Sequence, residues 1–216
     1  MKIAVMANGT WDLTWGNEVL ADVDYLVCAD GGADHAMDSG RIPDMLVGDM
    51  DSVSAETLKR CEEGGCLIRT FPCEKDETDL ELALHEAGKK AGMVGERDIW
   101  LYGATGGRID HLLGNTALLL AFARKGYRVR MADARHEIWV AQNEEQVRGS
   151  AGQVLSLLAL SEQATVTTKG LYYPLTEGIL RHDSTMGLSN VFLGEEAGLQ
   201  IHSGWVLAVL PRGKNM

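Results

Sequence analysis

Short apolar runs alternate with helical patterns over roughly the first 130 residues of the chain. The apolar runs predict strands over residues 2–7, 25–29, 44–47, 66–71, 98–102 and 127–132. The periodic segments between them predict helices over residues 17–23, 33–39, 54–63, 78–90 and 110–125. Strands that alternate with helices are typical of βαβ units. We therefore expect a Rossmann-like α/β domain with a mostly parallel sheet flanked by helices.

The clearest helix signal is in residues 78–90. Thr78 and Glu81 form a T-x-x-E capping-box pattern, and Leu80 and Leu84 then recur on one helical face. The helix expected at 54–63 is followed by a Gly pair that would stop it.

The pattern changes after about residue 134. The segments become short, rich in β-formers and separated by turns, as in "HEIWVAQ", "QATVTTKG" and "WVLAVLP". This texture predicts a second domain of antiparallel strands, either a small β-sandwich or a barrel. We expect domains over residues 1–133 and 134–216, with the boundary falling between residues 133 and 150.

Composition narrows the classes of function. The formal net charge of −11 argues against nucleic-acid binding, which needs a basic face, but it leaves anionic substrates possible through a divalent metal ion. The four cysteines form no C-x-x-C pair, so reduced thiols in a cytoplasmic protein are expected. The N-terminal apolar run is too short for a signal peptide, and no window approaches the roughly 18 apolar residues of a membrane span.

Polar clusters follow four of the expected strands. They are "ADGG" (29–32), "GDMDS" (48–52), "EKDETD" (74–79) and "GATGGRIDH" (103–111). Ligands of open α/β sheets bind outside the carboxyl ends of the parallel strands. We therefore expect the four clusters to converge at one sheet edge.

Asp49 and Asp51 are the most informative pair. In an extended chain they would project to the same face, with Met50 turned the other way into packing. Two adjacent carboxylates repel each other unless a cation lies between them, and Mg²⁺ shared with phosphate oxygens would supply it. The alternative is an Asx-type turn that caps the next helix. Asp44, which follows Pro43, is expected to be structural only.

Phosphate-binding features follow the later strands. Asp79 falls in the first turn of the expected helix, where backbone amides suit a phosphate, or where an acid simply complements the helix dipole. The pair Gly106-Gly107 would allow close backbone approach to phosphate, although the segment is neither a Walker loop nor a G-x-G-x-x-G fingerprint. Arg108 offers a planar fork for phosphoryl oxygens, followed by Asp110 and His111. His111 could instead be an ordinary hydrogen-bonding residue at a helix start.

In order along the chain, the motifs "DGG", "PDMLVGDMDS", "DETDLELAL", "GATGGRIDH", "GLYYPL" and "GLSN" resemble the thiamine pyrophosphokinase family. They span Asp30 to Asn190. The resemblance implies an enzyme that makes thiamine diphosphate and AMP from thiamine and ATP. It implies an ATP-binding α/β domain and a thiamine-binding sandwich. It also implies a homodimer whose active sites lie between one subunit's α/β domain and the other's sandwich.

The resemblance also implies roles for individual residues. Asp49, Asp51 and Asp79 match the Mg²⁺-binding and catalytic carboxylates. Arg108 matches a family position around the phosphates, and as a catalytic residue it is expected to stabilise the charge that develops on them. Residues and resemblance together give the expected ATP-binding set: Asp30, Gly31, Gly32, Thr78, Gly106, Gly107, Arg108, Asp110 and His111. The expected thiamine-binding residues are Tyr173, where the family often has a Trp, Ser189 and Asn190. Asp51 or Asp79 would orient or deprotonate the thiamine hydroxyl.

Three other functions fit parts of this pattern. The same ATP chemistry could use another acceptor, such as a hydroxymethyl pterin. Water could replace the acceptor, which would make the protein a Mg²⁺-dependent phosphohydrolase. The chain could also be a nucleotide-sensing module without catalysis.

Overall fold

The computed structural model describes residues 1–212 and divides into two compact units, residues 1–134 and 135–216. Residues 213–216 of the expected second domain lie outside the described part. Each unit is described by itself.

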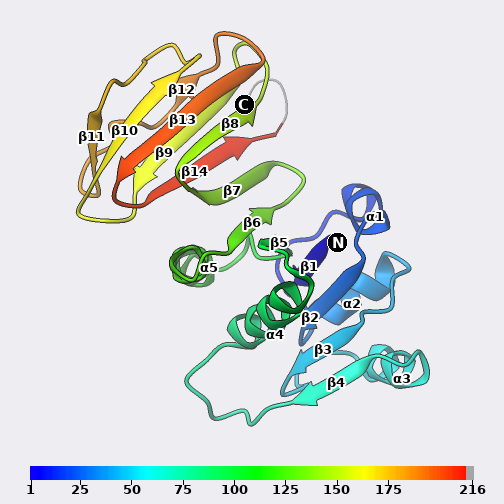
Figure 1. Cartoon of the computed structure of the whole chain (residues 1–216). Helices are drawn as coiled ribbons and strands as arrows, with labels where there is room; N and C mark the ends of the chain where they lie inside the picture. Colours follow the sequence, from blue (N-terminus) through cyan, green and yellow to red (C-terminus); the bar gives the residue numbers. More distant parts are fainter. Residues whose placement is uncertain (213–216) are drawn as a thin grey trace. The chain divides into compact units, whose positions relative to one another are not determined.

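Unit 1 contains one parallel sheet (Figure 1). Its strands are β1 (Ile3–Met6), β2 (Tyr25–Ala29), β3 (Met45–Gly48), β4 (Leu67–Thr70), β5 (Asp98–Tyr102) and β6 (Arg128–Ala132). The strand order is β4-β3-β2-β1-β5-β6, and every neighbouring pair is parallel. The predicted parallel α/β sheet is confirmed. All the strands of this sheet deliver their carboxyl ends to one edge.

Five helices cover this sheet: α1 (Leu13–Ala21), α2 (Gly32–Asp38), α3 (Ala55–Glu63), α4 (Asp79–Val94) and α5 (Ile109–Arg124). Leu20, Met37 and Cys61, from α1, α2 and α3, share one buried cluster with Met6 and Leu46 of the strands. The helix α4 packs on β1, β2 and β3, and α5 packs on β6. The strands are nearly continuous apolar runs because helices cover them.

The direction of strand addition reverses between β1 and β5, which makes this the topological switch point of the sheet. The loops that follow these two strands interlock closely. A side chain on Gly9 would collide with the carbonyl oxygen of Gly103, and one on Gly103 would collide with that of Ala7. Gly103 also has a φ of +63°, which favours glycine.

Unit 2 is a sandwich of two antiparallel sheets. Its strands are β7 (His136–Ala141), β8 (Glu144–Arg148), β9 (Val154–Ala159), β10 (Gln163–Lys169), β11 (Gly178–Arg181), β12 (Asn190–Val191), β13 (Glu196–Ser203) and β14 (Val206–Pro211). One sheet has the order β12-β9-β14-β7 and the other β11-β10-β13-β8. Trp139 and Leu157 of the first sheet share one buried core with Val166 and Leu199 of the second. The predicted β-sandwich is confirmed.

The first helix differs from its prediction. Residues 17–23 were expected to be helical, whereas α1 begins at Leu13 because the Asp12 side chain accepts a hydrogen bond from the Trp15 backbone amide.

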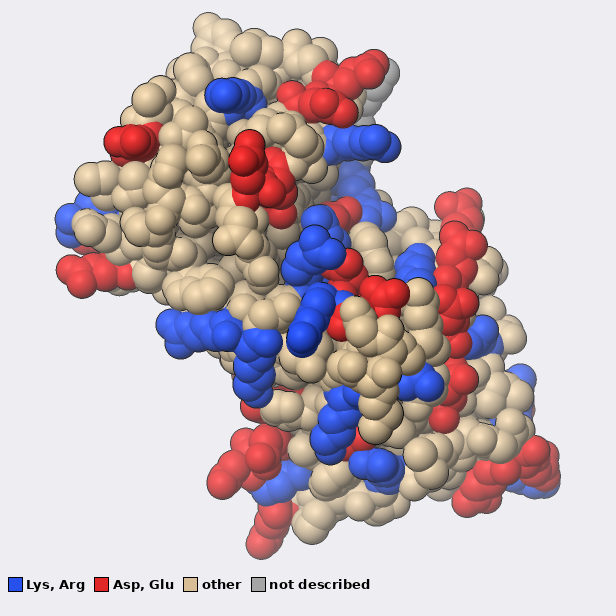
Figure 2. Space-filling model, viewed as in Figure 1, with Lys and Arg blue, Asp and Glu red and all other residues tan. Residues whose placement is uncertain are grey.

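Acidic side chains gather over α1 in Figure 2. Among the described residues, none of the helices has the length and apolar character needed to cross a bilayer.

Candidate active site

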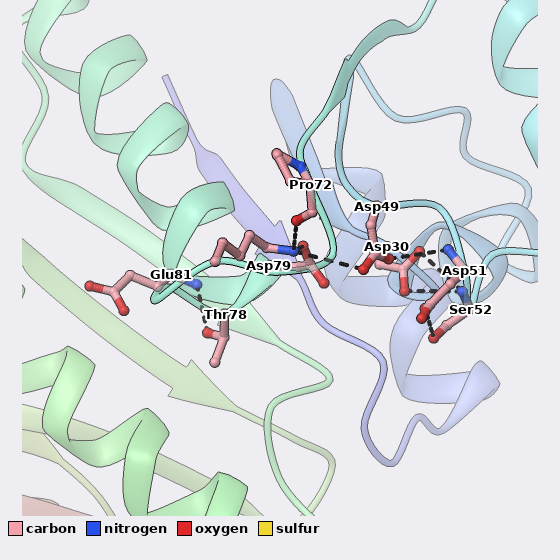
Figure 3. Close-up of polar contacts among 9 residues, drawn as sticks. Asp30, Asp49, Asp51, Ser52, Pro72, Thr78, Asp79 and Glu81 are labelled. Atoms are coloured by element: carbon pink, nitrogen blue, oxygen red, sulfur yellow. Dashed lines mark hydrogen bonds and ion pairs between the residues drawn. The ribbon is translucent and has the colours of Figure 1, made fainter.

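Four aspartates meet beyond the carboxyl ends of β2 and β3, where α4 begins (Figure 3). We call Asp30, Asp49, Asp51 and Asp79 the carboxylate cluster. One oxygen each from Asp30, Asp49 and Asp79 lies within 4.8 Å of the others, and Asp49 and Asp51 form a similar group with the Cys73 thiol. The three expected metal ligands, Asp49, Asp51 and Asp79, therefore fall into two groups that share Asp49.

The turn after β3 differs from the extended geometry that was expected. Met50 has a φ of +67°, so the chain is not extended between the two aspartates. The Asp49 side chain instead accepts a hydrogen bond from the Asp51 amide at 3.2 Å, as in an Asx-type turn. Met50 packs against the core as predicted. Neither aspartate caps the next helix, because Ser54 caps α3.

Glycine makes room for the carboxylates to approach one another. Gly48 has a φ of +154°, and a Cβ there would lie 3.0 Å from the Asp30 Cβ and 3.3 Å from the Asp79 Cγ. Asp30 itself has a φ of +43° and is buried, and it accepts a hydrogen bond from the Ser52 amide at 3.2 Å. Burial raises the pKa of Asp30, and the charges of Asp51 and Asp79 add to this rise.

The start of α4 fixes Asp79. Thr78 is the N-cap residue and accepts a hydrogen bond from the Glu81 amide at 3.2 Å, which confirms the predicted cap (Figure 3). Asp79 is the first residue of the helix. Its Oδ1 atom is buried and accepts no hydrogen bond from the described residues, although it has an ionic contact with Lys75.

The pair Gly31-Gly32 lies beside the cluster, at the start of α2. Gly31 is the N-cap residue, and a side chain there would collide with Asn8. A side chain on Gly32 would collide with the carbonyl oxygen of Met6. Both glycines therefore let α2 begin directly against the end of β1. The role expected for them in ATP binding remains a prediction.

Lys75 and Cys73 are two site residues that the sequence pattern did not single out. The Lys75 ammonium lies 3.0 Å from Asp79 Oδ1 and 3.8 Å from Asp49 Oδ2. Cys73 donates a hydrogen bond to Asp49, which is the largest cause of the lowered pKa of that carboxyl. The same bond raises the pKa of the Cys73 thiol. Lys75 belongs to the "EKDETD" segment, but its position in the sequence does not indicate that its side chain reaches Asp49, which follows β3.

The second expected phosphate-binding segment is at the start of α5. Arg108 donates two hydrogen bonds to Asp110, at 3.1 and 2.6 Å, so its present partner is a neighbour in sequence rather than the carboxylate cluster. This guanidinium lowers the pKa of Asp110 to about 2. The pair Gly106-Gly107 has φ values of +89° and +57°, as a tight turn requires, and His111 is exposed.

In unit 2, two of the expected thiamine-binding residues, Tyr173 and Asn190, are joined by hydrogen bonds. Tyr173 is 65% exposed and makes an edge contact with Tyr172. Asn190 is buried, and its side-chain amide bonds to both the amide and the carbonyl of Tyr173. Ser189 has a φ of +56°, and its amide bonds to Ser156. The structure thus places Asn190 as the residue that holds Tyr173 in position.

Two family models match the sequence. A family model described as "Thiamin pyrophosphokinase, catalytic domain" matches residues 17–131, and one described as the "vitamin B1 binding domain" of thiamin pyrophosphokinase matches residues 135–206. A thiamine pyrophosphokinase of Bacillus subtilis is 29% identical over 183 residues, which cover 83% of this chain and 84% of that protein.

Solved structures agree with this result. The crystal structure of thiamine pyrophosphokinase from Bacillus subtilis superposes with a TM-score of 0.84 at 26% identity, covering 98% of this chain and 99% of the other. The thiamin pyrophosphokinase from Geobacillus thermodenitrificans gives a TM-score of 0.83 at 28% identity, covering 100% and 99%.

Proposed function

The chain belongs to the thiamin pyrophosphokinase family, and we propose that the carboxylate cluster is the centre of its active site. The chain is a thiamine diphosphokinase: it transfers a diphosphate group from ATP to the hydroxyl of thiamine, giving thiamine diphosphate and AMP. The observation that carries the site assignment is the convergence of Asp30, Asp49 and Asp79 from three separate segments onto one point.

The donor set suits Mg²⁺. The carboxylate cluster offers only carboxylate oxygens, which Mg²⁺ prefers, and the buried Asp79 Oδ1 has only the ionic contact with Lys75 among the described residues. Asp49, Asp51 and Asp79 would hold Mg²⁺. Asp49 belongs to both of the groups described above, the one with Asp30 and Asp79 and the one with Asp51 and Cys73. When bound, Mg²⁺ would neutralise phosphate charge and hold the phosphates in one orientation.

The residues of the chain supply position and charge. The thiamine hydroxyl oxygen forms a bond to the β-phosphorus, and the bond from that phosphorus to the α-phosphate oxygen breaks, so that AMP leaves with the electron pair. The hydroxyl proton passes to the carboxylate of Asp51 or Asp79. Arg108, which is permanently charged, would exchange Asp110 for a phosphoryl group and stabilise the developing negative charge.

The nucleotide would lie along the carboxyl edge of the parallel sheet. Gly31-Gly32 and Gly106-Gly107 would allow the phosphates to approach the backbone closely, with Asp30, Thr78, Asp110 and His111 around them. The exposed ring of Tyr173 would stack on thiamine, with Ser189 beside it, and Asn190 would act by fixing the Tyr173 backbone.

We also propose that the protein is a homodimer, with active sites shared between the α/β unit of one subunit and the sandwich of the other. The family resemblance is the support for this assembly.

The cysteines are free, which is consistent with the expected reducing, cytoplasmic location.

One assay tests this function. The full chain is incubated with ATP, Mg²⁺ and thiamine, and AMP and thiamine diphosphate are measured by chromatography. We expect both products in equal amounts, and none without thiamine. AMP release without thiamine would indicate a phosphohydrolase, and AMP release only with a hydroxymethyl pterin would indicate another acceptor. Tight ATP binding without AMP would indicate a sensing module.

A further inference from the structure

A lysine lies inside the carboxylate cluster. The Lys75 ammonium lies 3.0 Å from Asp79 Oδ1 and 3.8 Å from Asp49 Oδ2, and it donates a hydrogen bond to the Pro72 carbonyl at 3.0 Å. Its side chain is only 13% exposed, although it belongs to the loop between β4 and α4. Lys89, which is also paired with an acid, is 62% exposed.

The charge balance around Lys75 is unlike that of an ordinary structural ion pair. Glu86 is a single buried carboxylate with two cationic partners, Arg69 at 2.8 Å and Lys89 at 2.7 Å. In the cluster, by contrast, the one ammonium of Lys75 contacts two carboxylates, those of Asp79 and Asp49. A third carboxylate, that of Asp30, has an oxygen within 4.8 Å of these two. If all three are ionised, the lysine charge of +1 leaves a net charge of −2, so Lys75 compensates only part of the negative charge of these carboxylates.

We propose that Lys75 is an internal counter-ion that occupies the cation position between Asp49 and Asp79 in the nucleotide-free protein. A divalent ion and an ammonium cannot share this position, because two cations a few ångströms apart repel each other strongly where water is partly excluded. Metal binding therefore displaces Lys75. This inference rests on the proposed function in one respect, because it takes the carboxylate cluster as the metal site.

The consequence is a protein that binds metal weakly until the nucleotide is present. Displacing the Lys75 ammonium costs free energy when no nucleotide is bound. The phosphates of ATP bring further negative charge, which stabilises both the metal ion and the displaced ammonium. Lys75 is thus a positioning residue that makes metal entry depend on the nucleotide.

The test measures Mn²⁺ binding to the full chain without nucleotide or thiamine, from the electron paramagnetic resonance signal of free Mn²⁺. We expect Lys75→Met to bind Mn²⁺ about tenfold more tightly than the wild type, because a competing unit charge has been removed. Lys75→Arg keeps the charge and should bind no more tightly than the wild type. Lys89→Met, the matched control, removes a paired lysine charge outside the cluster and should change nothing.

A further variant tests whether the Mn²⁺ ion binds at the carboxylate cluster. Adding Asp79→Asn to Lys75→Met should abolish the gain in affinity, because the cluster loses a ligand. Should Lys75→Met fail to fold, as judged by circular dichroism, Lys75→Gln carries the same expectation. An affinity for Mn²⁺ that is unchanged or weaker in the uncharged variant would overturn the proposal, as would a gain that survives Asp79→Asn.

This result is separable from the proposed function. If the wild type makes no thiamine diphosphate but Lys75→Met binds Mn²⁺ more tightly, the proposed function fails and the counter-ion role stands. If the wild type makes thiamine diphosphate but Lys75→Met binds Mn²⁺ no more tightly than the wild type, the proposed function stands and the counter-ion role fails.

Discussion

Two aspartates at opposite ends of β3 differ in what their carboxylates contact. Asp44 precedes the strand, and its carboxylate accepts hydrogen bonds from the Leu26 amide at 2.9 Å and from Arg41 at 3.2 Å. Asp51 follows the strand and is exposed, and its hydrogen bonds are to the adjacent turn. The expected structural role of Asp44 agrees with its contacts, since it satisfies a backbone donor between two strands.

Substitutions at these two positions should therefore separate stability from activity. Asp44→Ala leaves the Leu26 amide without its acceptor, which should cost about 1–3 kcal/mol of unfolding free energy in urea. Turnover per folded molecule should be retained. Asp51→Asn should keep the stability but lose turnover on the order of a thousandfold, measured as AMP release at saturating Mg²⁺. Near-normal turnover of Asp51→Asn would remove it from the proposed metal site.

Asp30 offers a prediction about pH. Its pKa in the folded protein is raised above the ordinary value of 3.8, chiefly by burial, so the folded state binds this proton more tightly than the unfolded state does. Ionised Asp30 therefore destabilises the fold at neutral pH, and the penalty is relieved as the pH falls through the folded pKa. Asn is uncharged, keeps an acceptor for the Ser52 amide and tolerates a positive φ.

We therefore expect Asp30→Asn to be more stable than the wild type at pH 7 in the presence of a chelator. The advantage should shrink as the pH is lowered to about 4. Urea unfolding at several pH values measures both. A variant that is less stable at pH 7, or whose advantage grows on acidification, would contradict this account of Asp30. Turnover should fall despite the added stability, because a member of the carboxylate cluster is lost.

At the scale of elements, local signals predicted α3 and α4, two helices that begin with a side-chain cap. Thr78 caps α4 and Ser54 caps α3, as short-range hydrogen-bonding patterns allow one to expect. The start of α1 was missed although Asp12 caps it, because tertiary packing also holds the residues that follow the cap. Gly16 lies against the Trp11 ring, and Trp11 and Trp15 pack on the core, so a segment that reads as polar and glycine-containing is helical in the fold.

The candidate site could be predicted in its location but not in its local geometry. Parallel strands bring Asp30, Asp49 and Asp79 to one edge, and this follows from the order of elements alone. The turn at Met50 could not be predicted, because left-handed backbone is uncommon for a residue other than glycine. Lys75 was missed for a different reason: its contact with Asp49 joins two loops, and no local pattern encodes it.

At the scale of the whole molecule, the two units carry different parts of the proposed site. Unit 1 holds the carboxylate cluster and unit 2 holds Tyr173. If active sites are shared between subunits, a subunit with an Asp51→Asn change and one with a Tyr173→Ala change should complement each other. In a mixed dimer, one site then has both changes and the other has neither.

The two variants, carrying different tags, are unfolded together and refolded so that subunits pair at random. About half of the dimers are then mixed and each has one intact site, so about a quarter of the wild-type activity should return. Activity is measured at a thiamine concentration well below the wild-type KM, where loss of the Tyr173 ring has most effect. The two variants refolded separately and then combined are the control. Activity no higher than this control in the mixed dimers purified by both tags would show that each site lies within one subunit.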